Sequence, residues 1–145
     1  MTQHDPLPEL PATRATVLCI EDHPVHMDVV EAVLARFAGV RMVKAYNGRD
    51  GVMLAQTTHP DIVLLDMNLP DISGLDVVRE LSVLISQRGL RVVLLTADSF
   101  SIDVVKALSL GAHAYWAKPM DVEQVAASLQ VLLDDGPRPR PRGAT

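Results

Sequence analysis

Carboxylates stand at the ends of two short apolar runs of this chain. Asp66 directly follows residues 62–65 (Ile-Val-Leu-Leu), and Glu21 and Asp22 directly follow residues 17–20 (Val-Leu-Cys-Ile). A charge at the end of a buried strand is costly unless a partner there uses it, and acids gathered at one sheet edge repel one another unless a cation holds them. The pattern therefore predicts a magnesium-dependent phosphoryl-acceptor site.

Each of these acids has an expected role. A carboxylate can act as a nucleophile and form an aspartyl-phosphate, and we assign this role to Asp66. Magnesium prefers oxygen ligands and keeps several waters, so we expect Asp22 and Asp66 to bind the ion directly and Glu21 to act largely through water. The backbone carbonyl of Met67 is a further oxygen within reach of the ion. We expect Mn²⁺ to substitute for Mg²⁺.

Two more polar positions close apolar runs later in the chain. Thr96 ends one run and is followed by the small residue Ala97, so its hydroxyl could donate to a phosphoryl oxygen while Ala97 leaves the approach open. Lys118 follows the last run and precedes Pro119, and a Lys-Pro bond that is cis would fix the ammonium over the site. A phosphoryl group in transfer is stabilised by such positioned donors and cations.

The apolar pattern predicts the elements that position these residues. Strands are expected at residues 16–20, 41–45, 62–66, 91–96 and 114–117. Apolar residues at helical spacing follow the strands, which predicts five helices and an α/β fold with a doubly wound, five-stranded parallel sheet. Ligands of such sheets bind outside the carboxyl ends of the strands, where all the polar positions above would gather.

Local signals mark the ends of the expected helices. Side chains suited to N-caps stand at four positions: Asn47, Ser73, Ser101 and Asp121. Glycines suited to a left-handed C-terminal position follow three expected helices: Gly39, Gly89 and Gly111.

Composition limits the class of protein. The chain has 145 residues, 48% of them hydrophobic and 21% charged, which is typical of one globular domain. Its net charge of −5 argues against a dedicated nucleic-acid binder. The sequence has neither an apolar run of about 20 residues nor a signal-peptide core, so we expect a cytoplasmic protein that does not span a membrane.

Six of the ten prolines lie near the two ends of the chain. We therefore predict disordered tails at residues 1–14 and 135–145, the second rich in Pro and Arg, around a body at residues 15–134.

Other reactive residue types have simpler interpretations. Cys19 lies inside an apolar strand and is expected to be a small buried hydrophobic residue rather than a reactive thiol. His23 and His26 lie three apart at the start of the first expected helix. A transition-metal pair is one interpretation of this spacing, but residues that face solvent or a kinase fit better, because oxygens of the neighbouring acids suit magnesium.

Taken together, these positions resemble the response-regulator receiver domain of two-component signalling, from Thr16 to Leu133. The residues that carry the resemblance are Glu21, Asp22, Asp66, Pro70, Gly74, Thr96, Ala97, Tyr115, Lys118 and Pro119.

The resemblance implies a flavodoxin-like sheet in the strand order 2-1-3-4-5 and a signalling domain rather than an enzyme. It implies that the phosphoryl group comes from a histidine kinase or a histidine phosphotransferase. On phosphorylation Thr96 would move toward the new oxygens, and Tyr115 would rotate inward behind it. The face formed by the fourth helix, the fifth strand and the fifth helix would then bind a protein effector, and the fourth-helix side is a possible homodimer contact.

Two residues are expected to affect the lifetime of the phosphorylated form, and a third departs from the family pattern. By resemblance, Asn68 and Asp98 flank the water that hydrolyses the acyl phosphate, so they are expected to set its lifetime. Trp116 is bulkier than usual, and two roles are equally open: an exposed anchor for a partner, or packing against the fourth or fifth helix.

Three other functions compete with this one. A dehalogenase-type phosphatase would place a second Asp two residues after the nucleophile, where this chain has Asn68. A flavodoxin-like nucleotide binder would need a phosphate cradle after the first strand, where Glu21 and Asp22 would repel phosphate. A pseudo-receiver that no longer takes phosphate is the third, and the complete set of acids with Thr96 and Lys118 argues against it.

About a dozen residues follow Leu133, too few for an effector domain. The chain is thus expected to be either a single-domain regulator or a receiver taken from a longer hybrid kinase, and Met1 with the polar ends favours the first.

Overall fold

The computed structural model describes residues 13–135, and its five strands form one parallel sheet in the order β2-β1-β3-β4-β5. The strands are β1 (Ala15–Ile20), β2 (Val40–Ala45), β3 (Ile62–Asp66), β4 (Arg91–Thr96) and β5 (Ala114–Ala117). The predicted strands are confirmed, with β1 and β2 each beginning one residue earlier than expected. The strand order implied by the resemblance is also confirmed.

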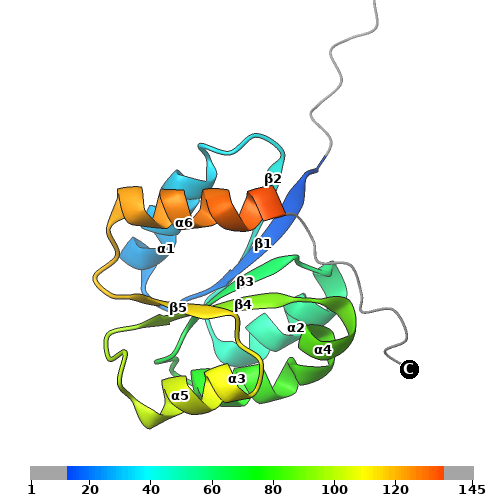
Figure 1. The fold of residues 1–145 in the computed structure, drawn as a ribbon, viewed down its shortest axis with the longest axis vertical. Helices are drawn as coiled ribbons and strands as arrows, with labels where there is room; N and C mark the ends of the chain where they lie inside the picture. The colour runs from blue at the N-terminus through cyan, green and yellow to red at the C-terminus, as the bar shows by residue number, and fades with distance from the viewer. Residues whose placement is uncertain (1–12, 136–145) are drawn as a thin grey trace, which may run out of the picture.

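Helices cover both faces of the sheet (Figure 1). One face carries α1 (Pro24–Leu34) and α6 (Val122–Asp135), and the other carries α2 (Gly48–Thr58), α3 (Gly74–Glu80), α4 (Ser82–Arg88) and α5 (Ile102–Ser109). Because side chains alternate along a strand, each strand supplies two separate cores. In β1, for example, Val17 and Cys19 pack with α1 and α6, whereas Leu18 and Ile20 pack under α2 and α3.

The expectation of five helices is wrong by one, because the third expected helix is interrupted at Leu81. This residue ends α3 and precedes α4 with φ −93° and ψ 3°, outside helical geometry. Leu81 is fully buried, whereas α4 has no fully buried residue and packs on the same core only through the partly buried Leu84 and Ile85. The helix called fourth in the sequence is therefore α5, and the fifth is α6.

The predicted N-caps are confirmed. The side chains of Asn47, Ser73 and Ser101 each accept a hydrogen bond from the backbone N–H three residues later, at 2.8, 3.0 and 3.1 Å. Asp121 accepts from the backbone N–H groups of Glu123 and Gln124, two and three residues later. The predicted left-handed glycines also have positive φ, although Gly39 lies in the turn before β2 rather than directly at the end of α1.

The sheet register brings the strand ends level with one another. Ile20 lies beside Leu65, Asp66 beside Leu95, and Thr96 beside Ala117. The residues that end or follow β1, β3, β4 and β5 therefore meet at one edge of the sheet, as parallel strands require.

Three remaining expectations concern Cys19, membrane-spanning helices and the two tails. Cys19 is buried, and this burial raises the pKa of its thiol far above the ordinary value, as expected of an inert residue. Among residues 13–135, no helix has both the length and the hydrophobicity to cross a membrane. The predicted tails, apart from Thr13, Arg14 and Asp135, lie outside the described residues.

Candidate functional site

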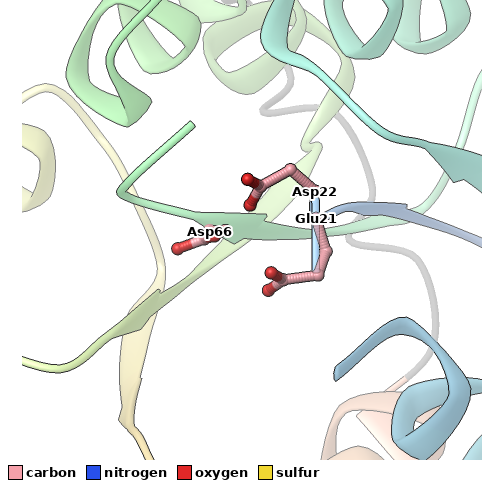
Figure 2. Close-up of side chains that lie close together, drawn as sticks. All are labelled: Glu21, Asp22 and Asp66. Carbon is pink, nitrogen blue, oxygen red and sulfur yellow. The ribbon is translucent and has the colours of Figure 1, made fainter. Parts of the chain in front are cut away.

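The three predicted acids meet at the carboxyl edge of the sheet. One carboxylate oxygen from each of Glu21, Asp22 and Asp66 lies within 4.8 Å of the others. Figure 2 shows that these side chains come from the ends of two neighbouring strands. Glu21 and Asp66 are buried, and Asp22 is exposed. An all-oxygen set of two or three carboxylates is what a hard divalent cation such as Mg²⁺ prefers, so the residues present fit the ion that the sequence predicts.

Lys118 is the cation that faces these acids. Its Nζ lies 2.9 Å from Oε2 of Glu21 and 3.3 Å from Oδ1 of Asp66, and its side chain is only 13% exposed. The Lys118–Pro119 bond is cis, the isomer that the sequence suggested. A single ammonium thus faces two buried carboxylates, which leaves the site with an excess of negative charge before any metal binds.

The pKa of the buried Asp66 carboxyl group reflects these surroundings. Burial raises the pKa of Asp66 above its ordinary value, and the neighbouring charge of Glu21 raises it further. The backbone N–H of Asn68, which donates to Oδ1 at 3.0 Å, and the ammonium of Lys118 lower the pKa only in part. The ionised form of Asp66 therefore carries a cost that a bound cation would remove.

The loop after β3 is held close behind Asp66. The N–H of Gly74 donates to the Met67 carbonyl at 3.3 Å, and a Cβ at position 74 would lie 2.7 Å from Cα of Met67. Glycine is required at this close approach of two backbone segments. From the same loop, Asp71 accepts the N–H groups of Gly48 and Arg49, both at 2.8 Å, and so ties the loop to the start of α2. Nothing in the sequence signalled this contact.

Thr96 lies at the edge of the site with its hydroxyl already engaged. Its Oγ1 donates to the carbonyl of Asp98 and accepts from the Asp98 N–H, both at 3.0 Å. The carboxylate of Asp98 in turn accepts from the N–H of Phe100 at 3.0 Å. Because a hydroxyl has one hydrogen, Thr96 can donate to a new oxygen only by releasing the Asp98 carbonyl.

The two aromatic residues of β5 differ in burial. Tyr115 is 43% exposed and so stands in an outward orientation. Trp116 is partly buried and packs against the core beneath α1 and α6. Of the two roles left open for Trp116, the structure favours packing.

All the predicted site residues except Tyr115 and Asp98 line one cleft of about 320 Å³ above these strand ends. The lining residues are Glu21, Asp22, His23, His26, Asp66, Met67, Asn68, Leu95, Thr96, Ala97 and Lys118. The sequence did not predict three of these lining residues: His23, His26 and Leu95. The spacing of the two histidines alone does not show what they face.

Comparison with known proteins decides the family. A family model of the response regulator receiver domain matches residues 17–130. The chain belongs to this family.

Named relatives agree with this assignment. The receiver is 38% identical to TcrX of Mycobacterium tuberculosis, described as a probable transcriptional regulatory protein, over 81% of this chain and 49% of TcrX. It is 32% identical to the protein PilH of Pseudomonas aeruginosa, over 82% of this chain and 98% of PilH. The chain thus spans about half the length of the first relative and nearly all of the second.

Solved structures include receivers of the same fold. The receiver domain of a sensor histidine kinase from Pseudomonas aeruginosa superposes with a TM-score of 0.70 at 28% identity, covering 83% of this chain and 98% of that one. That receiver was crystallised with a magnesium ion coordinated in its active-site cleft. Receiver domains bind Mg²⁺ at an acidic pocket, and this receiver has such a pocket in Glu21, Asp22 and Asp66.

Proposed function

We propose that this receiver domain accepts a phosphoryl group on Asp66 from a phosphohistidine of a histidine kinase or histidine phosphotransferase. The observation that carries the proposal is the buried Asp66 carboxylate, with Lys118 at 3.3 Å and two further acids within reach of one cation. An oxygen of Asp66 forms the new bond to phosphorus while the nitrogen–phosphorus bond of the donor breaks, and the donor imidazole keeps the electron pair and takes up a proton. No general base is needed, because a carboxylate supplies its own lone pair.

The remaining residues have supporting roles. Glu21, Asp22, Asp66 and the Met67 carbonyl would hold Mg²⁺, which neutralises charge on the transferring oxygens when it is bound. Lys118 contacts the phosphoryl oxygens from the β5 side, and the position of Ala97 leaves the approach open.

We further propose that this domain is a cytoplasmic signalling module that stores the phosphoryl group rather than turning over a substrate. The exposed residues Asn68 and Asp98, two positions after Asp66 and Thr96, would set the lifetime of the acyl phosphate through the water that hydrolyses it. In the structure the Asp98 carboxylate is turned toward its own loop, so a change in that loop would alter this water's surroundings.

A direct experiment tests the acceptor. The protein is incubated with phosphoramidate in Mg²⁺ or in EDTA, and its intact mass is measured. We expect a mass increase of one phosphoryl group in Mg²⁺ and little or none in EDTA. The absence of any adduct in Mg²⁺ would contradict the proposal and favour an interaction module that takes no phosphate.

The output surface is proposed to be the face of α5, β5 and α6. Phe100, Ile102, Val105 and Tyr115 are large, exposed hydrophobic residues on or beside α5 and β5. Such a surface suits a protein effector or a second copy of the chain. Phosphorylation would draw Thr96 away from Asp98 and allow Tyr115 to turn inward, which changes the face that a partner meets.

Tyr115→Ala should separate phosphorylation from this change. We expect the variant to form the adduct normally but to lose most of the phosphorylation-dependent change in amide hydrogen exchange of α5 and β5. Tyr46→Ala is a matched control, because Tyr46 is 49% exposed, against 43% for Tyr115, and lies between β2 and α2. An exchange response of wild-type size in Tyr115→Ala would show that Tyr115 does not report the phosphoryl group.

A further inference from the structure

His26 lines the same cleft as Lys118 and contacts its ammonium. It lies in the first turn of α1, 92 residues before Lys118, and its Nδ1 is 3.2 Å from Nζ of Lys118. The same nitrogen is 3.5 Å from Oε1 of Glu21. The side chain is 38% exposed, so it stands at the rim of the site rather than within the core.

The ammonium of Lys118 has one N–H group for each of the three acceptors that the structure describes around it. An ammonium carries three N–H groups and accepts no hydrogen bond. Around Nζ the structure places Oε2 of Glu21 at 2.9 Å, Nδ1 of His26 at 3.2 Å and Oδ1 of Asp66 at 3.3 Å. In this arrangement Nδ1 of His26 is the acceptor.

We propose that His26 is a positioning residue that holds the ammonium of Lys118 over the site while the carboxylates change partners. The inference rests on the proposed function. Of the three acceptors around Nζ that the structure describes, Glu21 is assigned to the metal and Asp66 to both the metal and the phosphoryl group. His26 has neither role, so its contact with Lys118 can persist through the reaction and limit the motion of a flexible four-carbon chain.

His26 is itself supported by its neighbour. The rings of His23 and His26 are stacked, with centroids 4.3 Å apart and planes 20° from parallel. His23 is the N-cap of α1, and its Nδ1 accepts the N–H of Val25 at 3.2 Å. The start of α1 thus fixes the first ring, the first ring supports the second, and the second holds Lys118.

This geometry also argues against the alternative of a transition-metal pair. The lone pairs of an imidazole lie in the plane of its ring, so two stacked rings do not direct them at one ion. Each Nδ1 also has a hydrogen-bond partner already, in Val25 for His23 and in Lys118 for His26.

Three variants test the role of His26. His26→Leu removes the acceptor, whereas His26→Asn places an amide oxygen on the same Cγ that carries Nδ1. His23→Ser keeps a side chain suited to the N-cap but removes the supporting ring. For each variant we would measure the rate of adduct formation with phosphoramidate in Mg²⁺, the Mg²⁺ affinity by calorimetric titration, and the thermal unfolding curve.

We expect His26→Leu to lower the rate about tenfold, as the loss of one hydrogen bond to a charged group predicts, without weakening Mg²⁺ binding. His26→Asn should restore the rate to within about twofold of wild type, because the acceptor returns. His23→Ser should show a smaller reduction of the rate than His26→Leu.

Two results would overturn the inference: equal rates for wild type and His26→Leu, or equal losses in His26→Leu and His26→Asn. If His26→Leu failed to fold, an unchanged rate in a folded His23→Ser would count against the inference, and a reduced rate would support it. Failure of the wild type to form any adduct would instead contradict the proposed function itself.

Discussion

Asp66→Asn is expected to abolish the phosphoryl adduct and, in the absence of metal, to raise the free energy of unfolding. The amide oxygen is not a nucleophile for phosphoryl transfer, so no adduct should be detected even in excess Mg²⁺. The gain in stability has a separate cause. In the wild type the ammonium of Lys118 faces two buried carboxylates, and the amide at position 66 leaves it with one, Glu21 at 2.9 Å.

The pH dependence of this stability difference follows from the raised pKa of Asp66. Burial, and then the charge of Glu21, raise the pKa of Asp66 in the folded state above its value in the unfolded chain. The folded protein therefore binds more protons than the unfolded one between these two values, so its stability falls as pH rises through that window. The advantage of Asp66→Asn should be absent below the unfolded pKa of about 4 and complete above the folded pKa.

Thermal unfolding in EDTA at several pH values measures this difference. The variant should unfold at a higher temperature than the wild type at neutral pH, and the two should converge at low pH. Mg²⁺ should stabilise the wild type much more than the variant, because binding to the folded state alone raises stability by mass action. A variant that is less stable than the wild type in EDTA at neutral pH would contradict the account of the charges.

Lys118→Met is expected to have the opposite effect on stability and to slow phosphoryl transfer strongly. Removing the ammonium leaves Glu21 and Asp66 buried without their cation, and breaking a buried ion pair in this way costs about 3 kcal/mol. The phosphoryl oxygens also lose a positioned cation, which predicts a rate about a hundredfold lower. The methionine side chain has similar length and volume, so packing at this position changes little.

Magnesium separates the two effects of Lys118→Met. Since the ammonium and Mg²⁺ are attracted by the same carboxylates, the variant should bind Mg²⁺ more tightly than the wild type, and saturating Mg²⁺ should recover most of its lost stability. The rate of adduct formation should remain low. A rate that returned to the wild-type value in Mg²⁺ would show that Lys118 stabilises the apo site only and does not act on the phosphoryl group.

Much of this site was predictable because parallel strands end together. Once the apolar runs before Glu21, Asp66, Thr96 and Lys118 were assigned to strands, the topology of an open sheet placed their ends at one edge. The periodicity was less informative about the helices. Apolar residues keep helical spacing through Leu81, so the sequence predicted one continuous helix where the backbone departs from helical geometry at Leu81.

The missed features of the site depend on contacts between residues distant in sequence. The types and order of Glu21 and Asp22 do not show that the first is buried against Lys118 while the second is exposed. Nor does the position of His26 show that it meets a side chain 92 residues away. Such pairs form only when the ends of β1 and β5 and the start of α1 meet at the sheet edge.

The central claim is that Asp66 itself carries the phosphoryl group. An acyl phosphate is reduced by borohydride to the corresponding alcohol, so a phosphorylated aspartate becomes homoserine and can be located by peptide mapping. After incubation with phosphoramidate and Mg²⁺, we predict homoserine at position 66 and at no other acid, and none in a sample treated without phosphoramidate. Homoserine at position 22, or the alcohol formed by reduction of Glu21, would contradict the account if Asp66 were unmodified.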